Sequence, residues 1–538
     1  MNNITSTTTT TSSSSTTITS TSIEMDQHNI PTNSSPIYYT REQLIAPPYT
    51  LIADILSIPV HIIKSISNIN VEGGLSCIIT RHTINYFETN NNTASSIPIP
   101  STLPTSFIIK TNRPNTSDNN ENLTKNVGLT REALFYTVLS KKILRTLHEA
   151  TSSTTTTTIT NNQDNNNIIS IPYCYYGYAD TQTGNKLMVL EDASNINISC
   201  PTPTSINNTS SSALTNLPPI NSGICFGPGS PLNWNHKPEI FENAYQYYGN
   251  CSDVTSSAFF MAANLHNSYF GDKTLLTYPW LRGVNAYINP NLGKEEFLNT
   301  QAYAMNNWKS YIENNTVWKQ NLENYTKYYQ ENSHHSKFLQ FQNKCSLQHT
   351  NTIKINDVEW PEYLLEIITL SLSQISWETY QLSLTTNKFR QYYTLVHGDY
   401  HPGNILIYSQ NMKNKYAKIM VLDYENIGIG SGPQDCGQFI ISHMDPKDRQ
   451  TTLLPTEKDF FYTHYYQHLS TNIQQLFTFE ECYQEYIYGG IERWVWLLCL
   501  LGSLCPSSYI QYWVNQLSTF CEDHSESLNF KQLSQPRL

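Results

Sequence analysis

The sequence predicts an α+β protein in which a small antiparallel sheet precedes a larger, mainly helical part. Short apolar segments with strand-like composition occupy the first 190 residues or so, whereas the second half carries long segments with helical spacing. The tracts between these segments are rich in Ser, Thr and Asn, as expected of loops. Within the helical half, residues 395–423 form a compact β-rich unit that ends in an acidic residue.

The composition limits the class of protein. The chain has 538 residues, of which 39% are hydrophobic and 14% charged, and its net charge is −11. A general nucleic-acid binder would need basic residues to neutralise phosphates, so no nucleic-acid partner is expected. The eleven cysteines include no C-x-x-C pair. Neither a zinc site nor a disulfide framework is therefore indicated, and reduced thiols in a cytoplasmic protein fit this pattern.

No targeting segment or membrane span is expected. Residues 1–15 are Thr- and Ser-rich and contain no apolar stretch of the kind found in secretory signals. The longest strongly apolar stretch, Val495–Leu501 with its flanks, falls short of the ~20 residues that cross a bilayer. We expect it to be a buried core helix.

Four regions are expected along the chain. They are a disordered Thr/Ser-rich tail at 1–48, an N-terminal lobe with polar insertions at 49–193, a low-complexity linker at 194–222, and a helical C-terminal lobe at 223–538. Further polar tracts at 90–96, 115–126 and 151–167 are expected to be surface loops, because closing a longer loop costs little extra free energy.

The N-terminal lobe is expected to contain five strands and one helix, in the order strand, strand, strand, helix, strand, strand. The expected strands are residues 62–70, 75–85, 107–110, 174–177 and 186–190. The helix is expected to begin at Thr130, a suitable N-cap, and to continue through Leu139, Ile143 and Leu147 at four-residue spacing. In the C-terminal lobe the clearest helices are 259–269 and 362–374, the second with the broad apolar pattern of a buried helix.

The most informative segment is residues 395–407, with the sequence LVHGDYHPGNILI. A short apolar run leads into a loop that contains Asp399, and Asn404 follows five residues later before an apolar strand resumes. Phosphoryl transfer needs a positioned hydroxyl group and neutralised phosphate charge. Asp399 can accept the proton of the hydroxyl, and Asn404 can turn back to a metal ion.

In a second acidic motif, VLDYE at 421–425, Asp423 lies nineteen residues after Asn404. An apolar strand that runs into Asp423 places a carboxylate where it can bind a magnesium ion that bridges phosphates. Asp399, Asn404 and Asp423, in this order on a strand–loop–strand unit, predict a phosphotransferase site that uses ATP and Mg²⁺.

The segment HGDYHPGN at 397–404 resembles the catalytic loop of the aminoglycoside phosphotransferase and choline kinase-like superfamily. The chain is most similar to the ecdysteroid kinase-like (CHK kinase-like) branch, over about residues 50–500. Protein kinases typically carry Arg where Gly398 stands, and the D-Y-E at 423–425 resembles the D-x-E/D of these families rather than D-F-G. Weaker matches are ANLHNSY at 263–269 and PWL at 279–281.

The resemblance implies a two-lobed protein kinase-like fold, with ATP and Mg²⁺ in the cleft and a small-molecule alcohol as the phosphate acceptor. It also implies further site residues. Lys110 would contact the α- and β-phosphates, and Glu132 would pair with Lys110 and orient it. Gly73 and Gly74 would form the turn that covers the phosphates, and Glu191 would lie in the hinge whose backbone binds adenine.

Each of these assignments has a structural alternative. Lys110 could be a solvated residue at a strand end, and Glu132 an exposed acid favoured by the helix dipole. Gly73 and Gly74 could form only a hairpin turn. For Glu191 the relevant atoms belong to the backbone, so its side chain says little.

Four further residues in or after the loop are candidates for supporting or binding roles. His397 is expected to orient the catalytic loop, and the resemblance implies that Asp435 braces the loop from the start of a helix. For His401 and Glu425, a role in binding metal or substrate and a purely structural role both remain open.

Two other functions are compatible with the sequence. A protein kinase is disfavoured by Gly398, by the D-Y-E motif and by the lack of an A-P-E-like motif after Asp423. A non-catalytic ATP-binding pseudokinase is disfavoured by the intact set of Asp399, Asn404 and Asp423, whereas the short glycine turn leaves this alternative open.

Overall fold

The computed structural model places residues 48–538 in one compact unit. The structure describes residues 49–71, 77–87, 103–112, 123–143, 169–193, 220–221, 249–331, 351–374, 376–408, 419–453, 455–526 and 528. The expected tail at 1–48, the tracts at 90–96 and 151–167, and residues 194–219 of the expected linker lie outside the described residues.

The N-terminal lobe is built on a five-stranded antiparallel sheet with the spatial order β1-β2-β3-β6-β5. Its strands are β1 (Ile63–Asn70), β2 (Cys77–Tyr86), β3 (Ser106–Asn112), β5 (Cys174–Asp180) and β6 (Asn185–Glu191). All five predicted strands are present, with ends that differ from the predicted ones by three residues or fewer. A short helix, α2 (Tyr49–Leu56), precedes the sheet and buries Leu51, Ile52 and Ala53.

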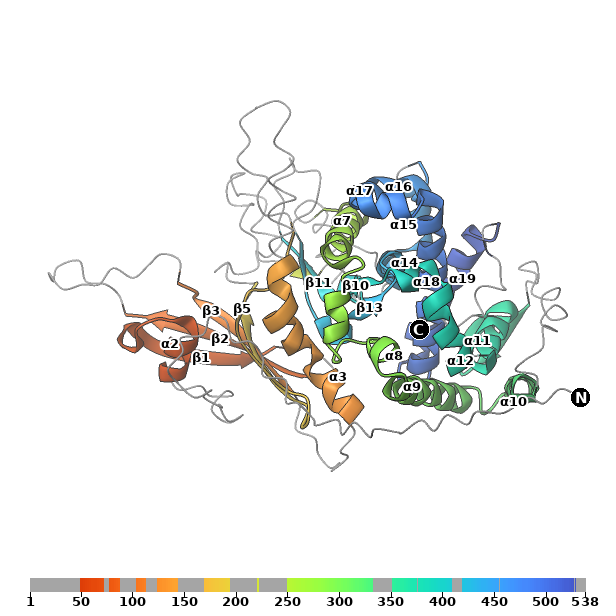
Figure 1. The fold of residues 1–538 in the computed structure, drawn as a ribbon, viewed down its shortest axis with the longest axis horizontal. Coiled ribbons are helices and arrows are strands. Elements are labelled where there is room, and N and C mark those ends of the chain that lie inside the picture. The colour runs from red at the N-terminus through yellow and green to blue at the C-terminus, as the bar shows by residue number, and fades with distance from the viewer. Residues whose placement is uncertain are drawn as a thin grey trace, which may run out of the picture. The chain divides into compact units, whose positions relative to one another are not determined.

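Helix α3 (Leu123–Leu134) lies between this sheet and the helical lobe (Figure 1). The predicted start at Thr130 is wrong: the helix begins seven residues earlier, inside the tract at 115–126 that was expected to be a loop. Thr130 donates a hydrogen bond to the carbonyl of Val127 (3.0 Å) from within the helix, and Val127 packs against the core. The helix continues into a π-helical turn, Phe135–Leu139, a deviation that occurs frequently at functional sites.

The sheet buries one histidine completely. His82 on β2 is 0% exposed, stacks on Phe107 with ring centroids 5.1 Å apart, and lies 2.9 Å from the hydroxyl of Thr80. Burial lowers the pKa of His82 from 6.5 to about 4, because the protonated ring would lose its hydration. The neutral form therefore stabilises the fold, fully above pH 6.5, and this contribution is lost as the pH falls towards 4.

We expect the free energy of unfolding to fall by up to roughly 3 kcal/mol from this group alone as the pH is lowered from about 6.5 to about 4. Urea unfolding at a series of pH values measures it. In a His82→Gln variant, which keeps a polar partner for Thr80 but does not titrate, this part of the decline should disappear. Equal slopes for the two proteins would contradict the assignment.

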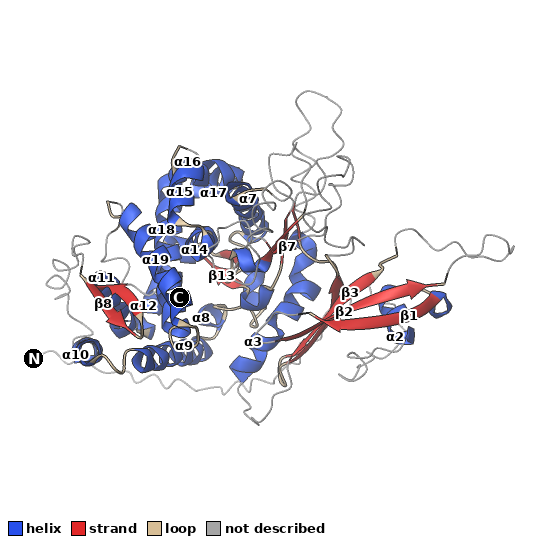
Figure 2. Ribbon diagram, turned by 180° about the vertical axis from the view of Figure 1, so that it is seen from behind, coloured by secondary structure: helices blue, strands red, loops and turns tan. Residues whose placement is uncertain are grey.

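The C-terminal lobe is mainly helical (Figure 2). Its helices are α7 (Cys251–Tyr269), α8 (Asn285–Ile288), α9 (Pro290–Tyr311), α10 (Thr316–Glu331), α11 (Glu362–Gln374), α12 (Trp377–Thr386), α13 (Lys388–Gln391), α14 (Pro433–His443), α15 (Pro446–Thr452), α16 (Glu457–His464), α17 (Thr471–Leu476), α18 (Phe479–Leu501) and α19 (Ser507–Asp523). A hairpin of β8 (Thr352–Ile355) and β9 (Val358–Pro361) precedes α11.

Both helices expected in this lobe are present. Helix α11 has the predicted ends, whereas α7 begins before the predicted Phe259 because Asn250 and Asp253 form a capping box at its start. The apolar stretch Val495–Leu501 lies within α18 and forms part of a core helix, as predicted. None of the described helices combines the length and apolar character needed to cross a membrane.

The β-rich unit consists of two small sheets. Strand β10 (Thr394–Val396) pairs antiparallel with β13 (Gly428–Gly430), and β11 (Ile405–Ile407) pairs antiparallel with β12 (Ile419–Val421). Two short strands flank the second pair, β4 (Ile169–Ser170) beside β12 and β7 (Ile220–Asn221) beside β11. Strand β7 lies in the region expected to be an unstructured linker. An antiparallel sheet followed by a helical lobe confirms the predicted two-lobed, kinase-like α+β fold.

Helices α14 and α18 meet at two glycines. A β-carbon on Gly490 would lie 2.8 Å from the α-carbon of Gly437, and one on Gly437 would lie 2.8 Å from the α-carbon of Gly490. Such distances are too short for any side chain, so the two backbones touch directly. Both helices carry residues that reach the catalytic loop, as described below.

Candidate active site

The predicted catalytic loop connects β10 to β11. Asp399 keeps 29% of its side-chain surface exposed, so a substrate has access to it. Its carboxylate lies within 3.5 Å of the amide nitrogen of Asn404 and within 3.3 Å of that of Gln438. Asn404 also donates to the backbone carbonyl of Asp399 (3.0 Å), which fixes the turn between the two residues.

Charges around Asp399 favour its ionised form. Burial alone would raise its pKa, but His401, whose ring nitrogen lies 3.7 Å from the carboxylate, and Arg493 outweigh burial. The pKa of Asp399 is therefore below its usual value. The carboxylate is charged at neutral pH and can accept a hydrogen bond from a hydroxyl group.

Asp435, at the start of α14, holds the backbone of the loop. Its carboxylate accepts hydrogen bonds from the backbone amides of His397 (2.8 Å) and Gly398 (3.1 Å) and lies 3.3 Å from Nε2 of His266. Asp435 is 2% exposed and His266 1%. Burial would raise the pKa of Asp435, but its histidine neighbours and backbone partners lower it instead. The expected bracing by Asp435 is thus seen directly.

His397 links the loop to the strand that carries Asp423. Its Nδ1 accepts from the backbone amide of Asp399 (3.3 Å), and its Nε2 donates to the carbonyl of Leu422 (2.9 Å). Burial lowers the pKa of His397, consistent with a neutral ring. The ring therefore positions the loop, as expected from the sequence.

The β11–β12 hairpin brings Asn404 and Asp423 to the same end. Ile405 pairs with Val421, and the amide of Leu422 donates to the carbonyl of Asn404 (2.8 Å). Asp423 follows with φ of 63°, a left-handed conformation that is rare for residues other than glycine and recurs at functional sites. Its side chain is 33% exposed.

Lys110 joins the two lobes. From β3, its ammonium group lies 2.6 Å from the carboxylate of Glu132 on α3 and 2.9 Å from that of Asp423. Glu132 is 1% exposed and Lys110 7%, which excludes the solvated positions considered for both. Burial would lower the pKa of Lys110, but the two carboxylates outweigh it and hold the pKa above its usual value.

A second buried lysine extends this network. Lys186 on β6 lies 3.5 Å from the carboxylate of Glu132 and 3.3 Å from that of Glu425, and its side chain is 0% exposed. Its role was not predicted, because a lysine near a strand end carries no signal of which side chain it meets. Glu425, which the sequence left open, pairs with this lysine.

Two arginines missed by sequence analysis also bind backbone carbonyls of the site. Arg131 on α3 donates to the carbonyl of Trp280 (2.8 Å) and to that of Glu425 (3.2 Å). Arg493 on α18 donates to the carbonyl of Gly398 (2.7 Å). Both come from segments distant in the sequence from the residues they hold, so no local pattern could identify them.

Glu191, predicted to lie in the hinge, ends β6. Its backbone amide donates to the carbonyl of Tyr173 (2.8 Å), and its carboxylate accepts from the amide of Tyr173 (3.1 Å). The amide of Glu191 is therefore already paired, so a nucleotide base would have to use its carbonyl or the residues that follow. Gly73 and Gly74 lie outside the described residues.

The predicted metal ligands fit magnesium in their chemistry. Among the described residues no group of three or more His, Cys, Asp or Glu side chains is arranged to hold a metal ion. Magnesium, however, is usually bound by one or two protein ligands together with substrate phosphates and water. The side-chain nitrogen of Asn404 donates to Asp399, so the side-chain oxygen of Asn404 remains for a cation. Lys110 contacts one carboxylate oxygen of Asp423, and the other oxygen remains for a cation.

Residues 310–478 match the model of the ecdysteroid kinase-like family. The expected resemblance is thereby confirmed, over a shorter stretch than residues 50–500. The matched segment contains the catalytic loop, Asp423 and Asp435, but neither Lys110 nor Glu132. A search of curated proteins found no match.

Similar solved structures include three small-molecule kinases. A microcompartment-associated aminopropanol kinase is 9% identical, covering 88% of this chain and 95% of its own, with a TM-score of 0.35. Choline kinase from Cryptosporidium parvum is 9% identical, with coverages of 86% and 89% and a TM-score of 0.33. Plasmodium vivax ethanolamine kinase is 12% identical, with coverages of 85% and 82% and a TM-score of 0.30. These TM-scores are too low to support a conclusion about the acceptor.

Proposed function

We propose that this protein is an ATP- and Mg²⁺-dependent phosphotransferase that moves the γ-phosphate of ATP to a hydroxyl group of a small molecule. The observation that carries this proposal is the pair of contacts made by Lys110, which join the N-terminal sheet and helix α3 to Asp423 in the C-terminal lobe. The family match supports a kinase-like activity. The small-molecule acceptor is favoured by Gly398 and the D-Y-E motif.

Asp399 would hold the acceptor hydroxyl and take its proton. A depressed pKa makes it a weak base, so it acts mainly by orienting the hydroxyl and accepts the proton late in the transfer. The amide groups of Asn404 and Gln438 keep the carboxylate in place. Asp435 and Arg493 fix the backbone on either side of Gly398, so the loop is formed before a substrate arrives.

Lys110 would bind the phosphates, with Glu132 as its permanent partner. Phosphate oxygens would compete with Asp423 for the ammonium group and free Asp423 for a cation. Asn404 and Asp423 would hold Mg²⁺. When bound, this ion offsets the charge that develops on the transferred phosphoryl group.

The test uses the full chain with Mg²⁺ and γ-labelled ATP against a panel of amino alcohols, sugars, sterols and aminoglycosides, with Asp399→Asn as the control. Label on one acceptor, lost in the variant, is the expected result and also identifies the acceptor. Mg²⁺-dependent ATP binding without transfer to any acceptor would favour the pseudokinase. Robust transfer to generic protein substrates would favour a protein kinase.

Lys110→Met is expected to lower kcat/KM for ATP by roughly 10²-fold, because one preorganised cation is lost from the phosphates. Lys186→Met is the matched control, since Lys186 lies near the same oxygen of Glu132 at the longer distance of 3.5 Å. It should weaken ATP use less and act mainly through stability. Steady-state kinetics with varied ATP measures both. A larger loss for Lys186→Met than for Lys110→Met would reverse the roles given to the two lysines.

A further inference from the structure

A cavity of about 180 Å³ lies in the C-terminal lobe beside β10, the strand that leads into the catalytic loop. Helix α9 forms one wall with Gly293, Glu296, Phe297 and Thr300, whose spacing places them on one side of the helix. A single buried water needs a cavity volume of only about 10–15 Å³, so this cavity has room for a small organic molecule. Asp399, Asn404, Asp423 and Lys110 do not line it, whereas Arg493, which holds the carbonyl of Gly398, does.

Two arginines, Arg282 and Arg493, line this cavity and form no ion pair, although Asp435 lies near enough to favour the charge of both and Asp399 that of Arg493. Among the described residues, no carboxylate lies within ion-pair distance of Arg282 or Arg493. Burial, together with the nearby Arg493 and Arg131, lowers the pKa of Arg282 to about 9. Two like charges that face one partly enclosed space favour a negatively charged occupant.

The three glutamates that line the cavity do not remove its preference for a negatively charged ligand. Glu296 accepts a hydrogen bond from Asn285 (2.7 Å), and burial raises its pKa, which favours the neutral acid. Glu485 and Glu492 are 7% and 8% exposed, and each has polar or charged partners of its own. The third arginine of the lining, Arg390, has its guanidinium 4.9 Å from the centre of the Tyr380 ring.

The remaining wall is largely aromatic. The rings of Phe297 and Tyr380 stack with centroids 5.1 Å apart, and Tyr287 and Trp496 also line the cavity. Flat apolar surfaces of this kind bind the body of a ligand, while a few charged groups fix its orientation.

We propose that this cavity is a second ligand site, which binds a small organic carboxylate. Arg282 and Arg493 hold the carboxyl group, and Tyr287, Phe297 and Tyr380 contact the apolar body. The proposal does not require the phosphoryl-transfer reaction, although Arg493 also holds the carbonyl of Gly398 in the catalytic loop.

Benzoate is a suitable probe, measured by isothermal titration calorimetry on the full chain at pH 7, with benzyl alcohol and benzylamine as neutral and cationic analogues. Benzoate is expected to bind with a Kd in the millimolar range, as its size allows, and at least tenfold more tightly than either analogue. Equal binding of benzyl alcohol, tighter binding of benzylamine, or no binding of benzoate would overturn the proposal.

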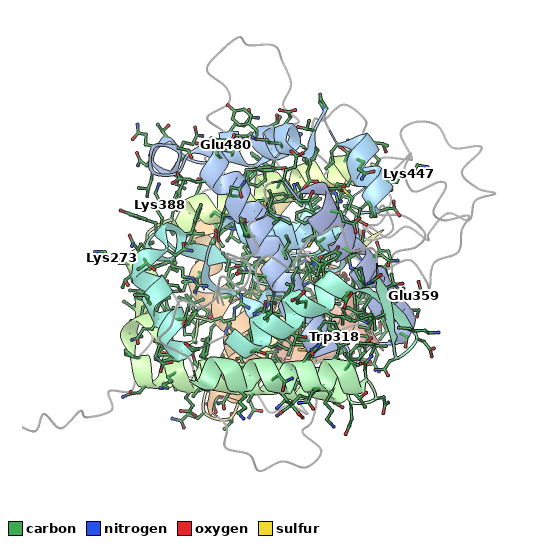
Figure 3. All side chains as sticks on the ribbon, turned by 90° about the vertical axis from the view of Figure 1, so that its right-hand side faces the viewer. Lys273, Trp318, Glu359, Lys388, Lys447 and Glu480 are labelled. Atoms are coloured by element: carbon green, nitrogen blue, oxygen red, sulfur yellow. The ribbon has the colours of Figure 1, made fainter. Side chains whose placement is uncertain are left out.

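Two variants locate the binding. Arg282→Met should weaken benzoate at least tenfold, but Arg282 lies beside Gly398 and its loss could disturb the fold. Thr300→Phe avoids this difficulty, because Thr300 is an exposed lining residue on α9, which lies at the surface in Figure 3. It should fill the cavity and abolish binding. Asn299→Phe, exposed on the same helix but outside the lining, is the matched control. Wild-type affinity in Thr300→Phe would exclude this cavity as the site.

Discussion

Replacing Asp399 by Asn is expected to reduce turnover by roughly 10²–10⁴-fold and to leave ATP binding largely intact. The asparagine has the same shape and can still contact the amides of Asn404 and Gln438, so the loop should keep its conformation. It cannot, however, accept the proton of the acceptor hydroxyl. Single-turnover transfer from γ-labelled ATP, together with equilibrium binding of ATP, separates the two effects.

The pH dependence gives a second check. Because the pKa of Asp399 lies below its usual value, the carboxylate is charged throughout the neutral range. The activity of the wild-type protein should therefore show no ionisation of this group between about pH 5 and pH 9. Wild-type turnover in Asp399→Asn would exclude Asp399 as the group that accepts the proton.

Asp435→Ala is expected to destabilise the fold by roughly 3–5 kcal/mol, the range for removing one partner from a buried charged network. The substitution leaves two buried backbone amides, those of His397 and Gly398, without their acceptor, and removes the partner of His266. Urea unfolding monitored by circular dichroism measures the loss.

Asp435→Asn is the matched control, because it keeps one acceptor oxygen and should lose less stability. The lowered pKa of Asp435 also determines the direction in which pH changes the stability of the protein. The pKa of Asp435 is lowered in the folded protein, so its contribution is present above its unfolded pKa and disappears in acid. The gap between wild type and Asp435→Ala should narrow below about pH 4. A pH-independent gap, or unchanged stability, would contradict this account.

The features predicted best are those that depend on residues close together in the chain. Asp399 and Asn404 are five residues apart, and a short hairpin carries Asp423 to the same end, so their grouping needs no long-range information. The five strands were identified because alternating apolar residues and turns mark them within a few residues. The start of α3 was missed because the segment at 123–128, LTKNVG, is polar and contains a glycine, whereas the contact of Val127 with the core depends on the tertiary fold.

Contacts between residues far apart in the chain could not be predicted from the sequence alone. The pairing of Lys110 with Glu132 was implied only by resemblance to a family, and Lys186, which meets the same carboxylate, had no such guide. Arg493 reaches the carbonyl of Gly398 from 95 residues away. These partners depend on how two lobes and two helices pack, and neither periodicity nor spacing encodes that.

The glycine contact between α14 and α18 makes one spot in the helical lobe intolerant of any enlargement. Asp435 lies two residues before Gly437, and Arg493 lies three residues after Gly490, so a methyl group at the crossing would push apart the two supports of the catalytic loop together. Substitutions at this crossing, rather than in the cleft, are therefore expected to give temperature-sensitive variants of the protein.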